Sequence, residues 1–212
     1  MNINPSDRLV TPAPDLDEYV IQEIITESSR DLTKRVPRRF WDATITVPPV
    51  REWVTELVDL AVKDRGKRDP VINYGRSMLL IGGVGSGKTH QSYGAVRALA
   101  GSGARLGWRF VTAADAFGSL RPRDGVDGEE EFHKLARCGF LVLDDVGAEK
   151  SSEWTESVLC RLINARYDHE RPTLVTTNVI GLAPVVGERV ASRLAQMCTP
   201  VVMDGPDRRR AP

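Results

Sequence analysis

The sequence predicts an α/β fold, built on a parallel sheet of about five strands with helices on both of its faces. Short apolar runs alternate with amphipathic stretches from residue 77 onward. This alternation is typical of parallel sheets, because each strand returns to the next through a helix that covers the sheet. A glycine-rich loop between the first apolar run and the helix after it, GGVGSGKT at 82–89, agrees with this class of fold.

The composition is that of a globular protein of ordinary size. The chain has 212 residues, of which 41% are hydrophobic and 27% charged. Lys and Arg total 29 and Asp and Glu also total 29, so bulk positive charge does not hold nucleic acid. Three scattered cysteines without a CxxC pair argue against a disulfide framework and a zinc site. Because no signal peptide and no long apolar run are found, we expect a cytoplasmic protein without membrane contact.

The amino-terminal third predicts two helices joined by a basic hinge. After a polar lead-in over residues 1–14, the sequence DLDE at 15–18 is typical of a helix start, and the first helix extends to about residue 35. The hinge KRVPRRFWDA follows at 34–43, and Pro48 and Pro49 begin the second helix. We predict that residues 1–45 form a separate helical segment and residues 46–212 the core. The isoleucine stripe of the first helix has two interpretations: it packs on a partner protein, or it folds back onto its own core.

The remaining elements follow from apolar runs and from the residues that end them. Helices end at the GSG sequence at 101–103 and before Pro172, since glycine and proline are typical of helix ends. Strands are expected at 77–81, 105–111, 140–143, 173–178 and 200–204. Helices are expected from the glycine-rich loop through Leu99, from residues 112–115, around 131–137, over 151–170 and over 187–197.

The sequence GGVGSGKT fits the pattern G-x-x-x-x-G-K-[ST] between a strand and a helix, as a phosphate-binding P-loop requires. Its glycines let backbone N–H groups turn toward phosphate oxygens at the positive end of the helix dipole. Lys88 is predicted to reach the β- and γ-phosphates of ATP. The alternative is an ordinary glycine-rich loop. The residues predicted to bind nucleotide here are Gly82, Gly83, Val84, Gly85, Ser86, Gly87, Lys88, Thr89 and His90.

Two polar strand ends predict the rest of the ATP site. The sequence FLVLDD places Asp144 to hold Mg²⁺ together with the Thr89 hydroxyl. Asp145 is then suited to orient or deprotonate the attacking water, or alternatively to cap the next turn. Asn178, at the end of the sequence TTN, is predicted to sense the γ-phosphate or the water, with a cap of a helix or turn as the alternative.

The stretch GERVASRLAQM at 187–197 places two arginines on one face of a predicted helix. Arg189 and Arg193 are four residues apart, while Val190, Leu194 and Met197 form an adjoining apolar strip. The strip would fix the direction of both side chains. On these residues alone, solvated or loosely ion-paired arginines are the alternative.

Taken together, these motifs resemble a known family. The sequences GGVGSGKTH, VTAADAFGSLR, LVLDDVGAEK, RPTLVTTN, GERVASRL and DGPDRRR occur in the order found in bacterial replicative helicase loaders. These are DnaC-like AAA+ ATPases, which also include the IstB-type transposition helpers. The resemblance covers about residues 36–212, and the combination of VLDDVGAEK with GERVASRL is more specific than the P-loop.

The resemblance implies a compact AAA+ core whose copies associate head to tail with ATP between them. It also implies recruitment to a hexameric DnaB-like helicase and a role in placing that helicase on single-stranded DNA. Arg193 matches the family's arginine-finger position, and Arg189 would support the same interface or the nucleotide. Only 19 residues follow Arg193, too few for the helical lid of general AAA+ proteins. The short amino-terminal segment would have to serve as the helicase-docking element.

The leading functional interpretation is therefore an ATP-dependent helicase loader. An IstB-like transposition helper is the nearest alternative. A small-molecule P-loop kinase would need a mobile arginine-bearing lid, and the only long charged insertion is RPRDGVDGEEE at 121–131, with Arg121 and Arg123. A module that uses ATP only as an assembly switch is a further alternative. The basic clusters at 34–39 and 208–210 either contact nucleic acid or are solvated charge.

Overall fold

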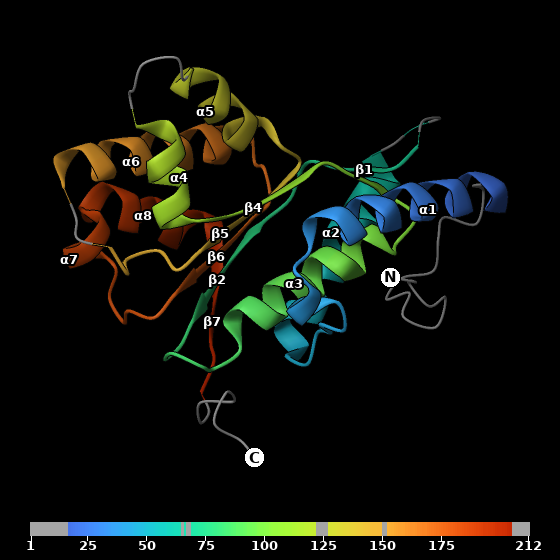
Figure 1. Cartoon of the computed structure of the whole chain (residues 1–212), viewed down its shortest axis with the longest axis horizontal. Coiled ribbons are helices and arrows are strands. Elements are labelled where there is room, and N and C mark those ends of the chain that lie inside the picture. Colours follow the sequence, from blue (N-terminus) through green and yellow to red (C-terminus); the bar gives the residue numbers. More distant parts are fainter. Residues whose placement is uncertain (1–16, 65, 67–68, 122–126, 150–151, 205–212) are drawn as a thin grey trace. The chain divides into compact units, whose positions relative to one another are not determined.

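The computed structural model describes residues 17–64, 66, 69–121, 127–149 and 152–204 (Figure 1). The sequence-based predictions that lie outside these residues are the lead-in over 1–14, the start of the DLDE cap at Asp15, Arg123, the start of the helix expected at 151, and residues 205–210 of the motif DGPDRRR, which include the basic cluster at 208–210. Within the described ranges, no helix is long and apolar enough to cross a membrane.

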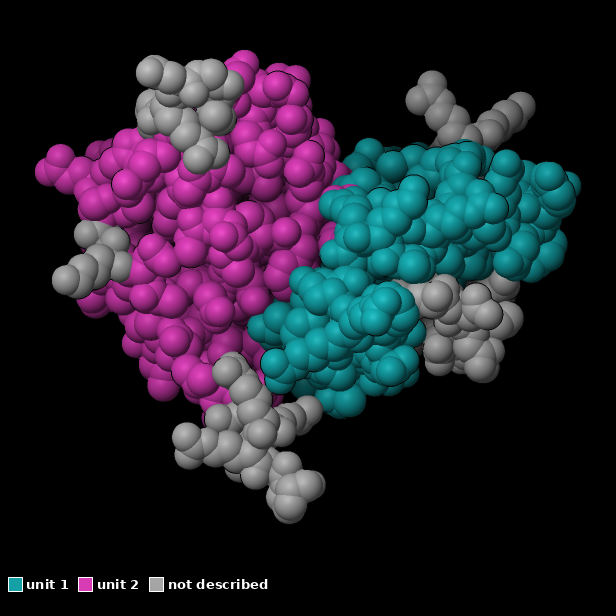
Figure 2. All heavy atoms as spheres, viewed as in Figure 1, with its two compact units in different colours: residues 1–75, 89–107 teal, residues 76–88, 108–212 magenta. Residues whose placement is uncertain are grey.

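The chain divides into two compact units, coloured separately in Figure 2. Unit 1 contains residues 1–75 and 89–107, and unit 2 contains residues 76–88 and 108–212. The predicted division at residue 45 concerns the roles of the two parts, and this packing does not test it.

Unit 2 is built on a five-stranded sheet in the order β4-β5-β6-β2-β7, and every neighbouring pair is parallel. β5 and β6 are buried along their whole lengths, although β6, with the sequence TLVTT, contains three threonines. The predicted class, an α/β fold with a five-stranded parallel sheet flanked by helices, is confirmed. The strands are β2 (Ser77–Ile81), β4 (Trp108–Thr112), β5 (Phe140–Asp144), β6 (Thr173–Thr177) and β7 (Cys198–Val202).

Five helices of unit 2 gather along one side of this sheet in Figure 1. They are α4 (Ala113–Leu120), α5 (Gly128–Arg137), α6 (Glu153–Asp168), α7 (Ala183–Val186) and α8 (Glu188–Met197). Side-chain caps fix three of their starts, from Thr112, Asp127 and Ser152. The apolar residues of α4, α5, α6 and α8 share one core with Leu79, Leu141 and Val175 of the strands. Among the described residues up to 204, no helix follows α8, which leads directly into β7.

Unit 1 contains α1 (Glu18–Arg35), the 3₁₀ helix η2 (Arg38–Phe40), α2 (Pro48–Asp64) and all of α3 (Lys88–Ala100) except Lys88. A two-stranded parallel sheet joins β1 (Val71–Ile72) to β3 (Arg105–Leu106).

The isoleucine stripe of α1 is buried within unit 1. Ile21, Ile24 and Ile25 are at most 5% exposed, and a Cβ on Gly103 would lie 2.9 Å from the Cγ2 of Ile21. The structure agrees with the second interpretation of the stripe, in which the helix folds back onto its own chain. A docking role for α1 would therefore depend on its other face.

Three boundaries differ from the prediction. The strand expected at 105–111 is divided at Gly107, where β3 pairs in unit 1 and β4 pairs in unit 2. Helix α5 begins at Gly128 rather than near 131, because the Asp127 side chain accepts hydrogen bonds from two N–H groups of its first turn. Strand β7 begins two residues before the expected 200.

Candidate nucleotide site

The P-loop leaves the carboxyl end of β2 with the geometry that its glycines permit. Gly85 and Gly87 have φ of 81° and 96°, in the left-handed region that favours glycine. A Cβ on Gly82 would lie 2.5 Å from the carbonyl oxygen of Met203, so only glycine allows this close approach. The loop therefore has the strongly curved backbone that turns N–H groups toward an anion.

Two side chains lie within this curve. The Nζ of Lys88, which is 6% exposed, donates hydrogen bonds to the carbonyl oxygens of Gly82 at 2.6 Å and Gly83 at 3.0 Å. The Oγ of Ser86 is buried and has no hydrogen-bond partner among the described residues. A buried hydroxyl of this kind needs a polar partner, and a phosphate oxygen is one. The cradle therefore fits the phosphates of a nucleotide.

The end of β5 supplies a buried and an exposed carboxylate side by side. Asp144 is 3% exposed, and its Oδ1 accepts a hydrogen bond from the Thr176 hydroxyl at 2.6 Å. Asp145 is exposed and has φ of 57°, a left-handed conformation that aspartate tolerates better than most residues. Its N–H donates to the same Thr176 hydroxyl at 3.0 Å. The Thr176 hydroxyl thus holds the buried carboxylate of Asp144 and the backbone of the exposed Asp145.

The parallel register gathers these predicted residues at one edge of the sheet. Ile81 pairs with Thr177, and the N–H of Gly82 continues this ladder by donating to the Thr177 carbonyl at 3.1 Å. The Thr177 hydroxyl donates to the carbonyl of Val146 at 2.7 Å, which ties the loop after Asp144 to the end of β6. Asn178 follows directly and is exposed. The P-loop, the two aspartates and Asn178 are therefore brought together.

Sequence reasoning missed Thr176. It is one of three threonines in the strand TLVTT, and the motif TTN directed attention to Asn178 instead. The residue is fully buried, and its hydroxyl forms the hydrogen bonds that fix Asp144 and Asp145.

We expect Thr176→Val to lower ATP turnover by about 10- to 100-fold, because Asp144 is the predicted Mg²⁺ ligand and hydrogen-bond partners of metal ligands have effects of this size. Stability should fall by about 1–3 kcal/mol, since a buried acceptor loses its donor. Steady-state phosphate release and urea unfolding measure the two effects. Thr176→Ser keeps the hydroxyl and is the control. If the valine variant turned over like the serine variant, the bridge would have no role in hydrolysis.

The helix that carries Thr89 and His90 anchors residues 43–47, the segment between η2 and α2. Gln91 is fully buried, and its Oε1 accepts hydrogen bonds from two successive N–H groups of this segment, at 3.0 and 3.1 Å. The Nε2 of His90 accepts a hydrogen bond from the N–H of Thr44 at 3.3 Å. His90, predicted to bind nucleotide, thus contacts the amino-terminal part of unit 1. Sequence reasoning missed Gln91.

The two arginines of α8 differ in their surroundings. Arg189 is exposed. Arg193 is half-buried, and its Nε donates to the side-chain oxygen of Asn164 on α6 at 3.1 Å. Its guanidinium carbon lies 4.4 Å from the centre of the Tyr167 ring, also on α6. Contacts with α6 therefore hold the Arg193 side chain in place.

The part of α6 that contacts Arg193 lies near the amino ends of the strands. Arg166, next to Tyr167, is fully buried and donates to the Thr173 hydroxyl at 2.7 Å and the Pro172 carbonyl at 2.9 Å. Burial lowers the pKa of Arg166 to about 10, so it stays protonated at neutral pH. Thr173 and Thr177 are the two ends of β6, roughly 13 Å apart at the usual rise per residue. The structure does not bring Arg193 together with the P-loop of its own chain.

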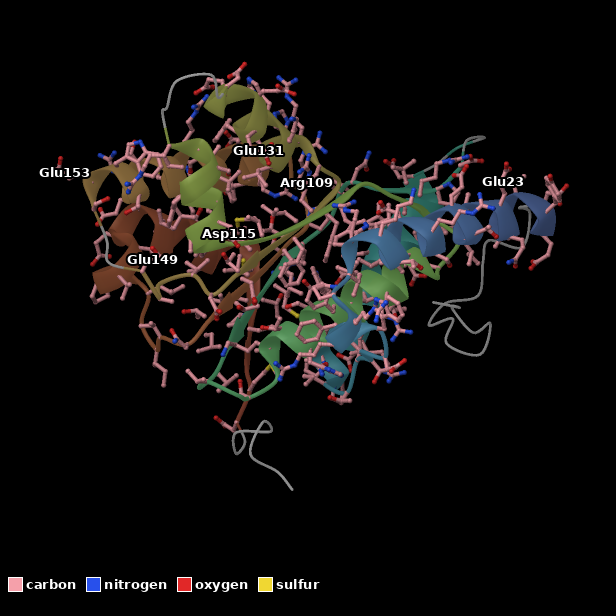
Figure 3. The ribbon with its side chains drawn as sticks, viewed as in Figure 1. Glu23, Arg109, Asp115, Glu131, Glu149 and Glu153 are labelled. Atoms are coloured by element: carbon pink, nitrogen blue, oxygen red, sulfur yellow. The ribbon has the colours of Figure 1, made fainter. Side chains whose placement is uncertain are left out.

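A pocket in unit 2 lies beside the loop after β5, and Figure 3 labels one of its carboxylates, Glu149. Its other lining residues include Phe117, Val146, Glu156 and Val185. None of the residues predicted to bind nucleotide lines this pocket. It is distinct from the cradle formed by the P-loop.

Comparison with known proteins identifies the family. The profile of the family described as IstB-like ATP binding protein matches residues 70–182. An ATP-binding protein in an insertion sequence of Mycobacterium tuberculosis (strain ATCC 25618 / H37Rv) is 30% identical over 196 residues, which are 88% of this chain and 77% of that protein. The chain belongs to the IstB-like ATP-binding family. It is accordingly a P-loop ATPase, as predicted.

Solved structures match the IstB-like chain over most of its length. The DnaC helicase loader superposes with a TM-score of 0.62 at 23% identity, over 79% of this chain and 100% of that chain. DnaI gives 0.60 at 21% identity over 82% and 94%, respectively. AMPPCP-bound DnaA from Aquifex aeolicus gives 0.58 at 20% identity over 74% and 44%. At these identities the likeness shows the fold alone, and that fold is the predicted AAA+ core.

Proposed function

We propose that this IstB-like ATPase is a helicase loader that binds and hydrolyses ATP at interfaces between head-to-tail copies of the chain. The observation that carries the proposal is the separation of the site's parts. The P-loop, Asp144, Asp145 and Asn178 lie at the carboxyl ends of the strands. By contrast, contacts with α6 hold Arg193 near the amino ends of the strands. A complete site then requires a second copy, which makes hydrolysis dependent on assembly.

In the proposed reaction, the P-loop N–H groups and Lys88 bind the phosphates and stabilise the charge that develops during transfer. The water oxygen bonds to the γ-phosphorus while the bond from that phosphorus to the β,γ-bridging oxygen breaks, so that ADP leaves. Asp145 accepts a proton from this water, and Asn178 holds the water in line. The Thr89 hydroxyl and the Asp144 carboxylate are hard oxygen donors that fit Mg²⁺, which takes few protein ligands and completes its shell with water and phosphate. When bound, Mg²⁺ supplies positive charge to the phosphate oxygens.

The proposed partners are a hexameric DnaB-like helicase and single-stranded DNA. The helicase is inferred from the fold, because the match to the DnaC helicase loader extends over all of that chain. Single-stranded DNA is inferred from the helicase, because a loader acts on the DNA strand on which it places the helicase.

A transposition helper is the second candidate, and a specific observation favours it. The relative that is 30% identical is described as an ATP-binding protein in an insertion sequence. The P-loop and the two acids serve both roles equally well, so the partner protein distinguishes them.

Affinity purification of the tagged full-length chain from cells that encode it tests the proposal. The purification is done with ATP present, and Lys88→Ala protein is the matched control for ATP-dependent capture. We expect a replicative helicase among the ATP-dependent partners. Capture of a transposase without the helicase would reject the loader and support the transposition helper.

A further inference from the structure

The basic hinge is an ordered part of unit 1. Here α1 ends at Arg35, Pro37 follows, and η2 begins at Arg38. The side-chain N–H of Trp41 donates to the carbonyl of Val36 at 3.0 Å, which closes the turn between the two helices. The Phe40 ring stacks on Tyr93 of α3 at 4.5 Å. Both aromatic rings of the hinge are therefore fixed.

An arginine side chain lies over each of these two rings. The guanidinium carbon of Arg38 lies 5.6 Å from the centre of the Trp41 ring, and that of Arg39 lies 5.9 Å from the centre of the Phe40 ring. Both arginines are exposed. A cation–π contact orders a guanidinium without neutralising its charge, so the cation stays available to an anion.

Several other arginines of the chain differ from Arg38 and Arg39 because they form ion pairs with carboxylates. In unit 2, Arg109 pairs with Glu131 and Arg161 with Glu129, and in unit 1 Arg105 pairs with Asp69. By contrast, no carboxylate in the described part of the chain forms an ion pair with Arg38 or Arg39.

The hinge is also strongly basic for a chain without net charge. Residues 30–42 contain five basic and two acidic residues, against 29 of each sign in the whole chain. Of the basic residues, Lys34 is exposed and Arg35 pairs with Asp31 within the same helix. Simple solvation accounts for scattered charges, but not for two guanidiniums held on rings inside a local excess of positive charge.

We propose that Lys34, Arg38, Arg39, Phe40 and Trp41 form a binding surface for single-stranded DNA, called here the basic–aromatic surface. The guanidiniums bind phosphates, and their planes, held on the rings, present a stacking face to unpaired bases. An acidic protein surface would meet the charges but would leave the ordered stacking planes without a role. The choice of DNA rests on the proposed function, whereas the position of the surface rests on these contacts.

Fluorescence anisotropy with a labelled 20-nucleotide thymidine strand tests the proposal, using the full-length chain without nucleotide across a series of salt concentrations. We expect Arg38→Gln/Arg39→Gln to weaken binding by about tenfold. The slope of log affinity against log salt should fall by about 1.4, because each single-strand phosphate contact contributes about 0.7. Trp41→Leu, which keeps every charge, should weaken binding without changing that slope.

As a control, Arg109→Gln/Arg161→Gln removes the same number of positive charges from unit 2. Figure 3 labels Arg109 and its partner Glu131. An equal loss in this control would mean that any surface charge suffices and would overturn the proposal. So would an unchanged affinity in the hinge variant, or tighter binding of duplex than of single strand. Loss of helicase capture with unchanged DNA binding would assign the surface to a protein instead.

The same variants keep this result separate from the proposed function. Arg38→Gln/Arg39→Gln should retain DNA-independent ATP hydrolysis, because these arginines lie outside the P-loop and acid motifs. Lys88→Ala should retain DNA binding in the absence of nucleotide. If the loader assignment is wrong, the partner purification shows it. If the basic–aromatic surface does not bind single-stranded DNA, the dependence of affinity on salt shows it.

Discussion

Lys88→Ala is expected to reduce ATP turnover by at least about 100-fold, since removing one donor that stabilises transferred charge typically has an effect of this size. Nucleotide affinity should also fall, because the Lys88 ammonium lies within the curve of the P-loop. Phosphate release and the anisotropy of a fluorescent ATP analogue measure these two quantities.

The structure indicates which control this experiment needs. Nζ of Lys88 donates to two loop carbonyls, so alanine also removes a contact that shapes the loop. Lys88→Arg restores a cation of different shape. Urea unfolding of both variants tells a misfolded loop from a lost phosphate contact. If the alanine protein matched the wild type in affinity and turnover, the P-loop assignment would be wrong.

The elements that carry the site could be predicted from the sequence because their signals are local. The strand Ser77–Ile81 is apolar after its first residue, and the pattern G-x-x-x-x-G-K-T after it is typical of a phosphate-binding loop between a strand and a helix. The position of Asp144 follows in the same way from the apolar run before it. Because the predicted sheet is parallel, the carboxyl ends of all its strands lie at the same edge of the sheet.

The features that could not be predicted depend on contacts between distant residues. β1 and β3 have two residues each, too short for a periodic signal, and they exist because they pair with each other. Nothing near Thr176 indicates that its hydroxyl bridges two acids from another strand. The stripe of α1 is visible in the sequence, but its burial within the chain is a tertiary property. The same holds for the contact of Arg193 with α6.

Arg193→Ala is expected to keep ATP binding and to lose most hydrolysis and ATP-dependent assembly. An arginine finger supplied from a neighbouring subunit contributes roughly 10³–10⁵ in rate. Its contacts with Asn164 and Tyr167 hold the guanidinium at a fixed angle, as an interface requires, and keep it toward the edge of the sheet opposite its own P-loop. Tyr167→Leu removes this support but keeps the arginine, so it should have a smaller effect.

Mixing Arg193→Ala protein with Lys88→Ala protein decides whether the arginine acts between chains. In a head-to-tail assembly formed at random from equal amounts, about a quarter of the interfaces join an intact P-loop to an intact Arg193, because each interface uses different faces of its two subunits. The mixture should therefore recover up to about a quarter of wild-type turnover, although each protein alone is nearly inactive. Co-assembly is verified by capturing one tagged variant and detecting the other. Co-assembled but inactive mixtures would mean that Arg193 acts within its own chain or supports only the packing of α8 on α6.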